Sequence, residues 1–289
     1  MSPAIVLERF APQLSDRTQD RLLSVLRNAA RTTRFYRDLA ASAGVDPQAD
    51  LTALAARLPK VELLDYLKYT ERYESPPSGL EAVRDALPHR RYFFPLTAMP
   101  RTALVSEGYW PRLNVRRFAN PWQPAMSRWA PEALAGPLDT VRAFAEGVAQ
   151  GYTWIPPLRH SITVQTGILE GPLSEADRDF FWRVFGVPVY EQFMGFGGEL
   201  IAHECEAHHG LHLVEENALA ERDETGEILL TWFSNPRHPV LRLGSGITAE
   251  LAAGTCACGR TSPRLLYPKR RLVSKPYRAL HAEALAGVQ

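Results

Sequence analysis

Residues 161–193 read SITVQTGILEGPLSEADRDFFWRVFGVPVYEQF, and this stretch decides the fold class. Residues 161–168 alternate β-branched and polar side chains, a pattern that is typical of a strand. Residues 173–186 predict a helix, because a Ser-Glu pair can cap its start and a glycine ends it. Residues 187–193 predict a second strand. A strand, a helix and a strand in this order indicate a βαβ unit, which predicts a parallel sheet.

Helices are expected before this unit and short strands after it. Residues 16–43 and 138–151 place apolar side chains at helical spacing, and from Glu199 the pattern changes to short strands separated by turns. We therefore predict an α/β fold with a parallel or mixed sheet, flanking helices and a small C-terminal β subdomain. Residues 1–198 are expected to form a helical and α/β section and residues 199–289 a β-rich subdomain, together making one compact protein.

The composition excludes several classes of protein. The chain has 289 residues, of which 45% are hydrophobic, and this is enough for a core and argues against disorder. A net charge of +1 gives no reason to expect nucleic acid as a partner. The first residues do not resemble a signal peptide, and no stretch is apolar for long enough to cross a bilayer. We expect a cytoplasmic protein without a membrane partner.

The three cysteines carry the strongest chemical signal. Cys205 and His212 flank a turn, while Cys256 and Cys258 form a Cys-x-Cys pair. An odd number of cysteines in a reducing compartment argues against a disulfide framework. Three thiolates and one imidazole make a complete tetrahedral set for a structural zinc ion, which we predict at these residues. The alternative is that they are small buried thiols without a metal.

Five segments occur in the order found in phenylacetate–CoA ligase-like enzymes, and the chain resembles that family. They are FGVPVYEQF (185–193), ECEAHHGLHLVEEN (204–217), ETGEILLTWF (224–233), PVLRLGSGIT (239–248) and CACGRTSPRL (256–265). The resemblance implies the large N-terminal domain of an adenylate-forming enzyme, a superfamily that activates carboxylic acids with ATP and passes the acyl group to coenzyme A. It also implies a homodimer, and zinc, which some members carry in the similar segments.

The chain departs from this family where ATP is used. The family's glycine-rich phosphate loop corresponds to FFPLTAMPRTALVSEG (93–108), in which PLTAMPRTALVS has no glycine and two prolines, although such loops need glycine and backbone N–H donors. FMGFGG (193–198) lacks the family's magnesium-binding glutamate, for which Glu199 could substitute only after a shift. Gly246 or Ser245 stands in place of the aspartate that holds the ATP ribose, and the small C-terminal domain with its catalytic lysine has no counterpart. These departures predict that ATP is not used and that the large domain is truncated.

An enzyme without ATP can still move an acyl group that is already activated. The resemblance places the acyl pocket at the segment formed by Phe193, Met194, Gly195, Phe196, Gly197 and Gly198, whose aromatic and glycine residues suit a flat aromatic acyl group. Core packing is the alternative for the aromatic side chains.

Cys205 has a second interpretation, as a nucleophile that carries the acyl group between two thiols. His203 is the best base by spacing, because it lies two residues away and on the same face of a strand, while His208, His209 and His212 are less determined. A thiolate held in a closed zinc site is a poor nucleophile, so the two roles of Cys205 compete.

We therefore predict an ATP-independent acyltransferase of secondary metabolism that moves an aromatic acyl group from a coenzyme A thioester to an acyl carrier protein through a cysteine acyl-enzyme. The alternatives are a zinc-stapled binding module without catalysis and, less favoured, a residual ligase that needs a second chain. Several basic residues could contact the carrier protein or the phosphates of coenzyme A, although charged runs are more often solvated surface. They are Arg116, Arg117, Arg128, Lys269, Arg270, Arg271 and Lys275.

Overall fold

The computed structural model describes residues 16–47, 49–75, 100–106, 114–118, 124–233 and 238–267. The chain forms two compact units, each made from segments that are not contiguous in the sequence. Unit 1 comprises Met1–Leu87, Leu213–Ala253 and Ser262–Tyr267, and unit 2 comprises Pro88–His212, Gly254–Thr261 and Pro268–Gln289. The expected boundary between residues 198 and 199 lies inside unit 2.

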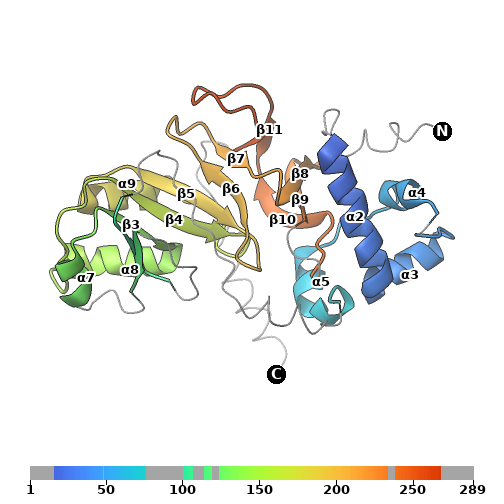
Figure 1. Ribbon diagram of the computed structural model, residues 1–289, viewed down its shortest axis with the longest axis horizontal. Helices are drawn as coiled ribbons and strands as arrows, with labels where there is room; N and C mark the ends of the chain where they lie inside the picture. Colours follow the sequence, from blue (N-terminus) through green and yellow to red (C-terminus); the bar gives the residue numbers. More distant parts are fainter. Residues whose placement is uncertain are drawn as a thin grey trace. The chain divides into compact units, whose positions relative to one another are not determined.

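Unit 2 is built on a mostly parallel sheet. Its strands in spatial order are β7 (Leu211–Leu213), β6 (Leu200–Glu204), β5 (Val189–Met194), β4 (Ser161–Gly167), β3 (Ala133–Pro137), β1 (Thr102–Leu104) and β2 (Val115–Arg117). The strands from β2 to β5 pair in parallel, and β6 pairs antiparallel to β5. Helices α8 (Leu138–Ala149) and α9 (Glu175–Phe185) pack on this sheet and against each other (Figure 1), and the short helix α7 (Pro124–Trp129) precedes β3. The predicted α/β fold with flanking helices is confirmed.

The core of unit 2 lies between the sheet and its helices. Leu134 of β3 and Ile162 of β4 are fully buried, as are Val141 and Phe144 of α8 and Phe181 of α9. Burying one such side chain stabilises a fold by roughly 1.5–3 kcal/mol. The central strand β4 is buried at every position. The βαβ unit read from the sequence is therefore the centre of this core.

Unit 1 joins N-terminal helices to antiparallel strands. The helices are α2 (Asp16–Thr32), α3 (Arg34–Ser42), α4 (Leu51–Ala56), α5 (Leu63–Lys68) and the 3₁₀ helix η1 (Thr70–Arg72). The strands β8 (Ala218–Arg222), β9 (Glu227–Trp232) and β10 (Leu243–Thr248) form one sheet, and β11 (Glu250–Ala252) pairs with β12 (Arg264–Leu266). No helix among the described residues has the length and apolar character needed to cross a membrane.

The helix predicted over residues 16–43 is interrupted, and in this respect the prediction is wrong. Thr33 is extended, with φ −102° and ψ 149°, and separates α2 from α3. The hydroxyls of Thr32 and Thr33 donate to the carbonyls of Asn28 and Ala29 at 2.7 and 2.9 Å. Such bonds compete with the regular helical pattern and favour a break at consecutive threonines.

The start of α9 offers a direct test of helix capping. Ser174 Oγ accepts a hydrogen bond from the Asp177 backbone N–H at 3.1 Å, as an N-cap residue does. Ser174→Ala is expected to lower the free energy of unfolding by about 1 kcal/mol, measured by denaturant or thermal unfolding. Ser42→Ala, which removes an exposed hydroxyl at the end of α3, is the control and is expected to change stability by less than about 0.5 kcal/mol. Equal stabilities of the two variants would contradict the capping role.

Candidate metal centre and ligand-binding turn

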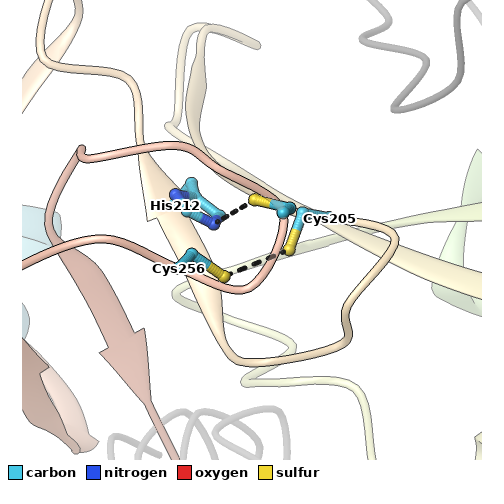
Figure 2. Close-up of side chains that lie close together, drawn as sticks. Cys205, His212 and Cys256 are labelled. Carbon is cyan, nitrogen blue, oxygen red and sulfur yellow. Dashed lines mark hydrogen bonds between the residues drawn. The ribbon is translucent and has the colours of Figure 1, made fainter.

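The four residues predicted as metal ligands come together in unit 2. The ligand atoms of Cys205, His212, Cys256 and Cys258 all lie within 4.8 Å of one another. Figure 2 shows the side chains of Cys205, His212 and Cys256 pointing toward one another. Three of the four residues are buried, and Cys258 is partly exposed. The group is able to hold a metal ion.

The first two ligands are positioned by the connection between β6 and β7. Cys205 directly follows β6, and its carbonyl accepts the His208 backbone N–H at 3.0 Å. His208 and Gly210 both have positive φ, which reverses the chain so that His212 returns on β7 beside Cys205. Glycine adopts this conformation without steric cost.

The other two ligands lie on a tight turn. The Gly259 N–H donates to the Cys256 carbonyl at 2.9 Å, and the Cys256 N–H donates to the Arg260 carbonyl at 2.8 Å. These bonds bring the thiols of a Cys-x-Cys pair to one side of the turn. The Arg260 guanidinium also donates to a Glu206 carboxylate oxygen at 2.8 Å, so an ion pair joins the two ligand-bearing turns.

The distances between the ligand atoms fit a tetrahedral zinc ion. The Sγ atoms of Cys205 and Cys256 are 3.8 Å apart, and Cys258 Sγ lies 3.5 Å from His212 Nε2. Zinc bonds of about 2.3 Å to sulfur and about 2.0–2.1 Å to nitrogen, in a tetrahedron, separate two sulfurs by about 3.8 Å and sulfur from nitrogen by about 3.5 Å. Three sulfurs and one imidazole leave no position for a substrate, which is the form of a structural site.

Burial controls the protonation of the thiols. It raises the pKa of Cys205 to about 11, so as a free thiol this residue is neutral and weakly nucleophilic. Burial acts in the same direction on Cys258, but hydrogen bonds, first from the Arg260 backbone N–H and then with Cys205 and Cys256, lower its pKa to about 7. A metal ion would hold these sulfurs as thiolates.

His203, the predicted base for Cys205, is a buried residue of β6. Its Nδ1 lies 3.1 Å from the Glu204 carbonyl oxygen, which assigns the N–H to Nδ1 and leaves Nε2 as the acceptor. The ring stacks on that of His212, with centroids 5.9 Å apart. Burial lowers the pKa of His203 to about 4, so the imidazole is neutral at pH 7. Its action as a base stays a prediction.

The predicted acyl-binding segment forms a turn between β5 and β6. The Gly195 N–H donates to the Glu199 carbonyl at 2.8 Å, and the Gly198 N–H donates to the Gly195 carbonyl at 3.0 Å. Gly198 has a φ of 79°, which requires glycine here. The pairing of β5 with β6 is irregular between Phe193 and Met194, and irregular pairing of this kind often lies next to active sites.

This turn lies where open α/β sheets bind ligands. Met194 ends β5 and pairs with Gly167, the last residue of the parallel strand β4. Ligands of such sheets bind beyond the carboxyl ends of the strands. Phe193 and Met194 are buried, whereas Phe196 is 38% exposed. The segment therefore contains both core residues and an aromatic side chain that reaches solvent.

The position that the resemblance assigns to the ribose-binding aspartate is occupied by internal contacts of unit 1. Ser245 is buried, and its hydroxyl donates to the Ile228 carbonyl at 2.7 Å. The Gly246 N–H donates to a carboxylate oxygen of Glu227 at 2.8 Å, and the other oxygen of Glu227 pairs with Lys60 at 2.6 Å. Neither Ser245 nor Gly246 offers a carboxylate to a ribose.

The structure describes only some of the basic residues that were expected to contact a carrier protein or coenzyme A. Arg116 and Arg117 are exposed on β2, and Arg128 is exposed on α7. The Arg116 guanidinium lies over the Phe118 ring, 5.4 Å from its centroid. The remaining predicted basic residues, from Lys269 to Lys275, lie outside the described residues, as do residues 93–99 and 107–108 of the segment matched to the phosphate loop.

Sequence analysis missed a buried ionic group beside the candidate metal centre. Glu191 accepts the Thr166 hydroxyl at 2.7 Å, and an Arg178 nitrogen lies 3.5 Å from it. Arg178 is closer to Glu204, at 2.9 Å, and Glu204 also contacts the His208 ring at 2.9 Å. Burial raises the pKa of Glu191 to about 7. A glutamate within the mostly apolar strand pattern VPVYEQF was the available signal.

The comparisons with known proteins identify the fold. No protein-family model matches the sequence, and no curated protein does. A 2-hydroxyisobutyryl-CoA ligase in an open conformation, in complex with 2-HIB-AMP and CoA, superposes with a TM-score of 0.65 at 18% identity, over 86% of this chain and 67% of the ligase. The same ligase in the thioesterification state, also with 2-HIB-AMP and CoA, gives a TM-score of 0.63 at 16% identity, over 89% of this chain and 68% of the ligase. The chain has the fold of these enzymes and spans about two thirds of their length.

Proposed function

We propose that the chain is an ATP-independent acyltransferase that moves an acyl group from a coenzyme A thioester to the phosphopantetheine thiol of an acyl carrier protein. The fold is that of a ligase whose structures contain CoA and an acyl-AMP, which supports a substrate of the acyl-CoA class. The resemblance of the sequence to phenylacetate–CoA ligase-like enzymes supports an aromatic acyl group. The sequence also resembles the anthranilate transferase of aurachin biosynthesis, so anthraniloyl-CoA is the first donor to test.

An ATP-independent reaction is supported by the internal contacts at Ser245 and Gly246, the position matched to the ribose-binding aspartate. Ser245 and Gly246 replace the aspartate, and both already use their donors within unit 1. The sequence matched to the phosphate loop has no glycine in PLTAMPRTALVS, so close approach of the backbone to phosphates is unfavourable there. An acyl group supplied as a thioester needs neither feature, because transfer between two thiols is nearly balanced in energy.

We assign Cys205 to zinc and not to acyl transfer. Its thiol is buried within 4.8 Å of three other ligand atoms, and its Sγ lies 3.8 Å from Cys256 Sγ, a separation that fits a tetrahedral zinc site. A closed site of this kind stabilises structure. The transfer would then be direct, from one thiol to the other, without an acyl-enzyme on Cys205.

The test is transfer without ATP. The purified chain is incubated with anthraniloyl-CoA or benzoyl-CoA and a holo-acyl carrier protein, and the intact masses of both proteins are followed. We expect an acylated carrier protein and no acyl adduct on the chain. An adduct that disappears in Cys205→Ala would restore the nucleophilic role of that residue. Carrier binding without turnover would favour the binding-module alternative, and ATP–pyrophosphate exchange would favour the residual ligase.

A further inference from the structure

The turn between β5 and β6 contains a carboxylic acid whose contacts are incomplete. Glu199 is buried, with 9% of its surface exposed, and its Oε1 has no hydrogen-bond partner among the described residues. Hydrogen bonds from the backbone N–H groups of Glu199 and Gly197 hold the carboxylate. Buried polar atoms are nearly always paired, so an unpaired carboxylate oxygen indicates a functional group or a missing partner.

Glycine at position 195 makes room for this carboxylate. A Cβ atom placed on Gly195 would lie 2.6 Å from both Cδ and Oε1 of Glu199, so the Glu199 side chain would have to leave this position to admit one. The turn therefore combines a glycine with an acid whose side chain occupies the space beside it. Core packing alone does not explain this pairing, because an apolar residue would fill the same space without the cost of burying a charge.

The Glu199 carboxylate lies at the edge of the sheet where a ligand is expected to bind. Glu199 follows the turn at the carboxyl ends of β4 and β5, and the exposed ring of Phe196 lies in the same turn. Ligands of parallel sheets bind at this edge. We propose that Glu199 is the general base of the acyl transfer, with Oε1 accepting the proton of the attacking thiol. This inference rests on the proposed acyltransferase function.

The proposed step is balanced in protons and bonds. The acceptor sulfur forms a bond to the carbonyl carbon of the donor thioester while its proton passes to Glu199. The bond between that carbon and the sulfur of coenzyme A then breaks, and the proton passes from Glu199 to the departing sulfur. Burial raises the pKa of Glu199 above its ordinary value, which makes the carboxylate a stronger base.

The experiment compares the wild-type chain with Glu199→Gln, using benzoyl-CoA as donor and either pantetheine or thiophenol as acceptor. Glutamine keeps the shape and an oxygen for the backbone N–H groups, but it cannot take a proton. With pantetheine, kcat is expected to fall about 100-fold or more, while KM for benzoyl-CoA changes little. With thiophenol, which is ionised at pH 8 and needs no base, the defect should shrink to less than about 10-fold. Glu250→Gln, an exposed residue of β11 in unit 1, is the control and should behave as wild type.

The outcomes separate the base from a positioning role and from failure of the proposed function. Glu199→Gln activity within about threefold of wild type with pantetheine would overturn the proposal. An equal loss with both acceptors would also overturn it, since that would indicate misplacement of the substrate. If the wild-type chain transfers no acyl group to either thiol or to a holo-acyl carrier protein, the acyltransferase function itself fails and the role of Glu199 fails with it. Thermal unfolding of both variants establishes that each is folded.

Discussion

Cys256→Ser is expected to abolish zinc binding and to lower the midpoint of thermal unfolding by roughly 6–12 °C, corresponding to about 3 kcal/mol of lost stability. The wild-type chain is expected to hold one zinc ion, because its four ligand atoms lie within 4.8 Å of one another and form a complete tetrahedral set. A serine hydroxyl is a poor zinc ligand, and the remaining ligands then lose the ion that joins the turn at Cys256–Gly259 to the connection between β6 and β7. Native mass spectrometry measures the metal, and calorimetry or circular dichroism measures unfolding.

A chelator supplies the matched control for this prediction. Removing zinc from the wild-type chain should lower its unfolding midpoint to that of Cys256→Ser, and the same chelator should not affect the variant further. The competing interpretation, small buried thiols without a metal, predicts no zinc in the native mass and no effect of the chelator. Those two results together would refute the metal centre.

The parts of the fold that could be predicted from the sequence are those that local patterns determine. The βαβ unit is local, because a strand pattern, a Ser174 cap and a left-handed Gly186 follow each other within about thirty residues. The clustering of the four candidate metal ligands was predictable, because three cysteines and a histidine at such spacing are typical of a metal site. The break at Thr33 was missed because apolar periodicity continues across it, and only the hydroxyl contacts of the two threonines reveal the competing interaction.

Other features depend on contacts between distant segments. The division into two units joins the N-terminal helices to residues 213–253, which no local pattern indicates. Helix α7 lies within a stretch rich in aromatic, proline and arginine residues, a composition that does not by itself indicate a helix. The unpaired oxygen of Glu199 and its space beside Gly195 are likewise visible only in three dimensions. In each case the sequence supplies the residue type, and the tertiary structure decides its role.

The stability of the chain is expected to depend on pH through Glu191. Its pKa is about 7 in the folded chain, because burial outweighs its hydrogen bonds, against an ordinary value of 4.5. Between these two pH values the folded chain keeps a proton that the unfolded chain releases, so stability falls as pH rises from 4.5 to 7 and then levels off. The full contribution is roughly 3 kcal/mol. Glu191→Gln should remove this slope and make the chain more stable than wild type at pH 8 by a similar amount.

Urea unfolding of wild type, Glu191→Gln and the exposed control Glu250→Gln at pH 5 and pH 8 tests this dependence. The difference in the free energy of unfolding between wild type and Glu191→Gln reports the titration of Glu191 alone, because the pH dependence of zinc binding is common to all three chains. The control should follow wild type at both values of pH. Parallel behaviour of Glu191→Gln and wild type would instead show that Arg178 holds Glu191 ionised. The structure argues against that result, because the Arg178 guanidinium lies 3.5 Å from Glu191 but 2.9 Å from Glu204. Its positive charge therefore stabilises the ionised form of Glu204 more than that of Glu191.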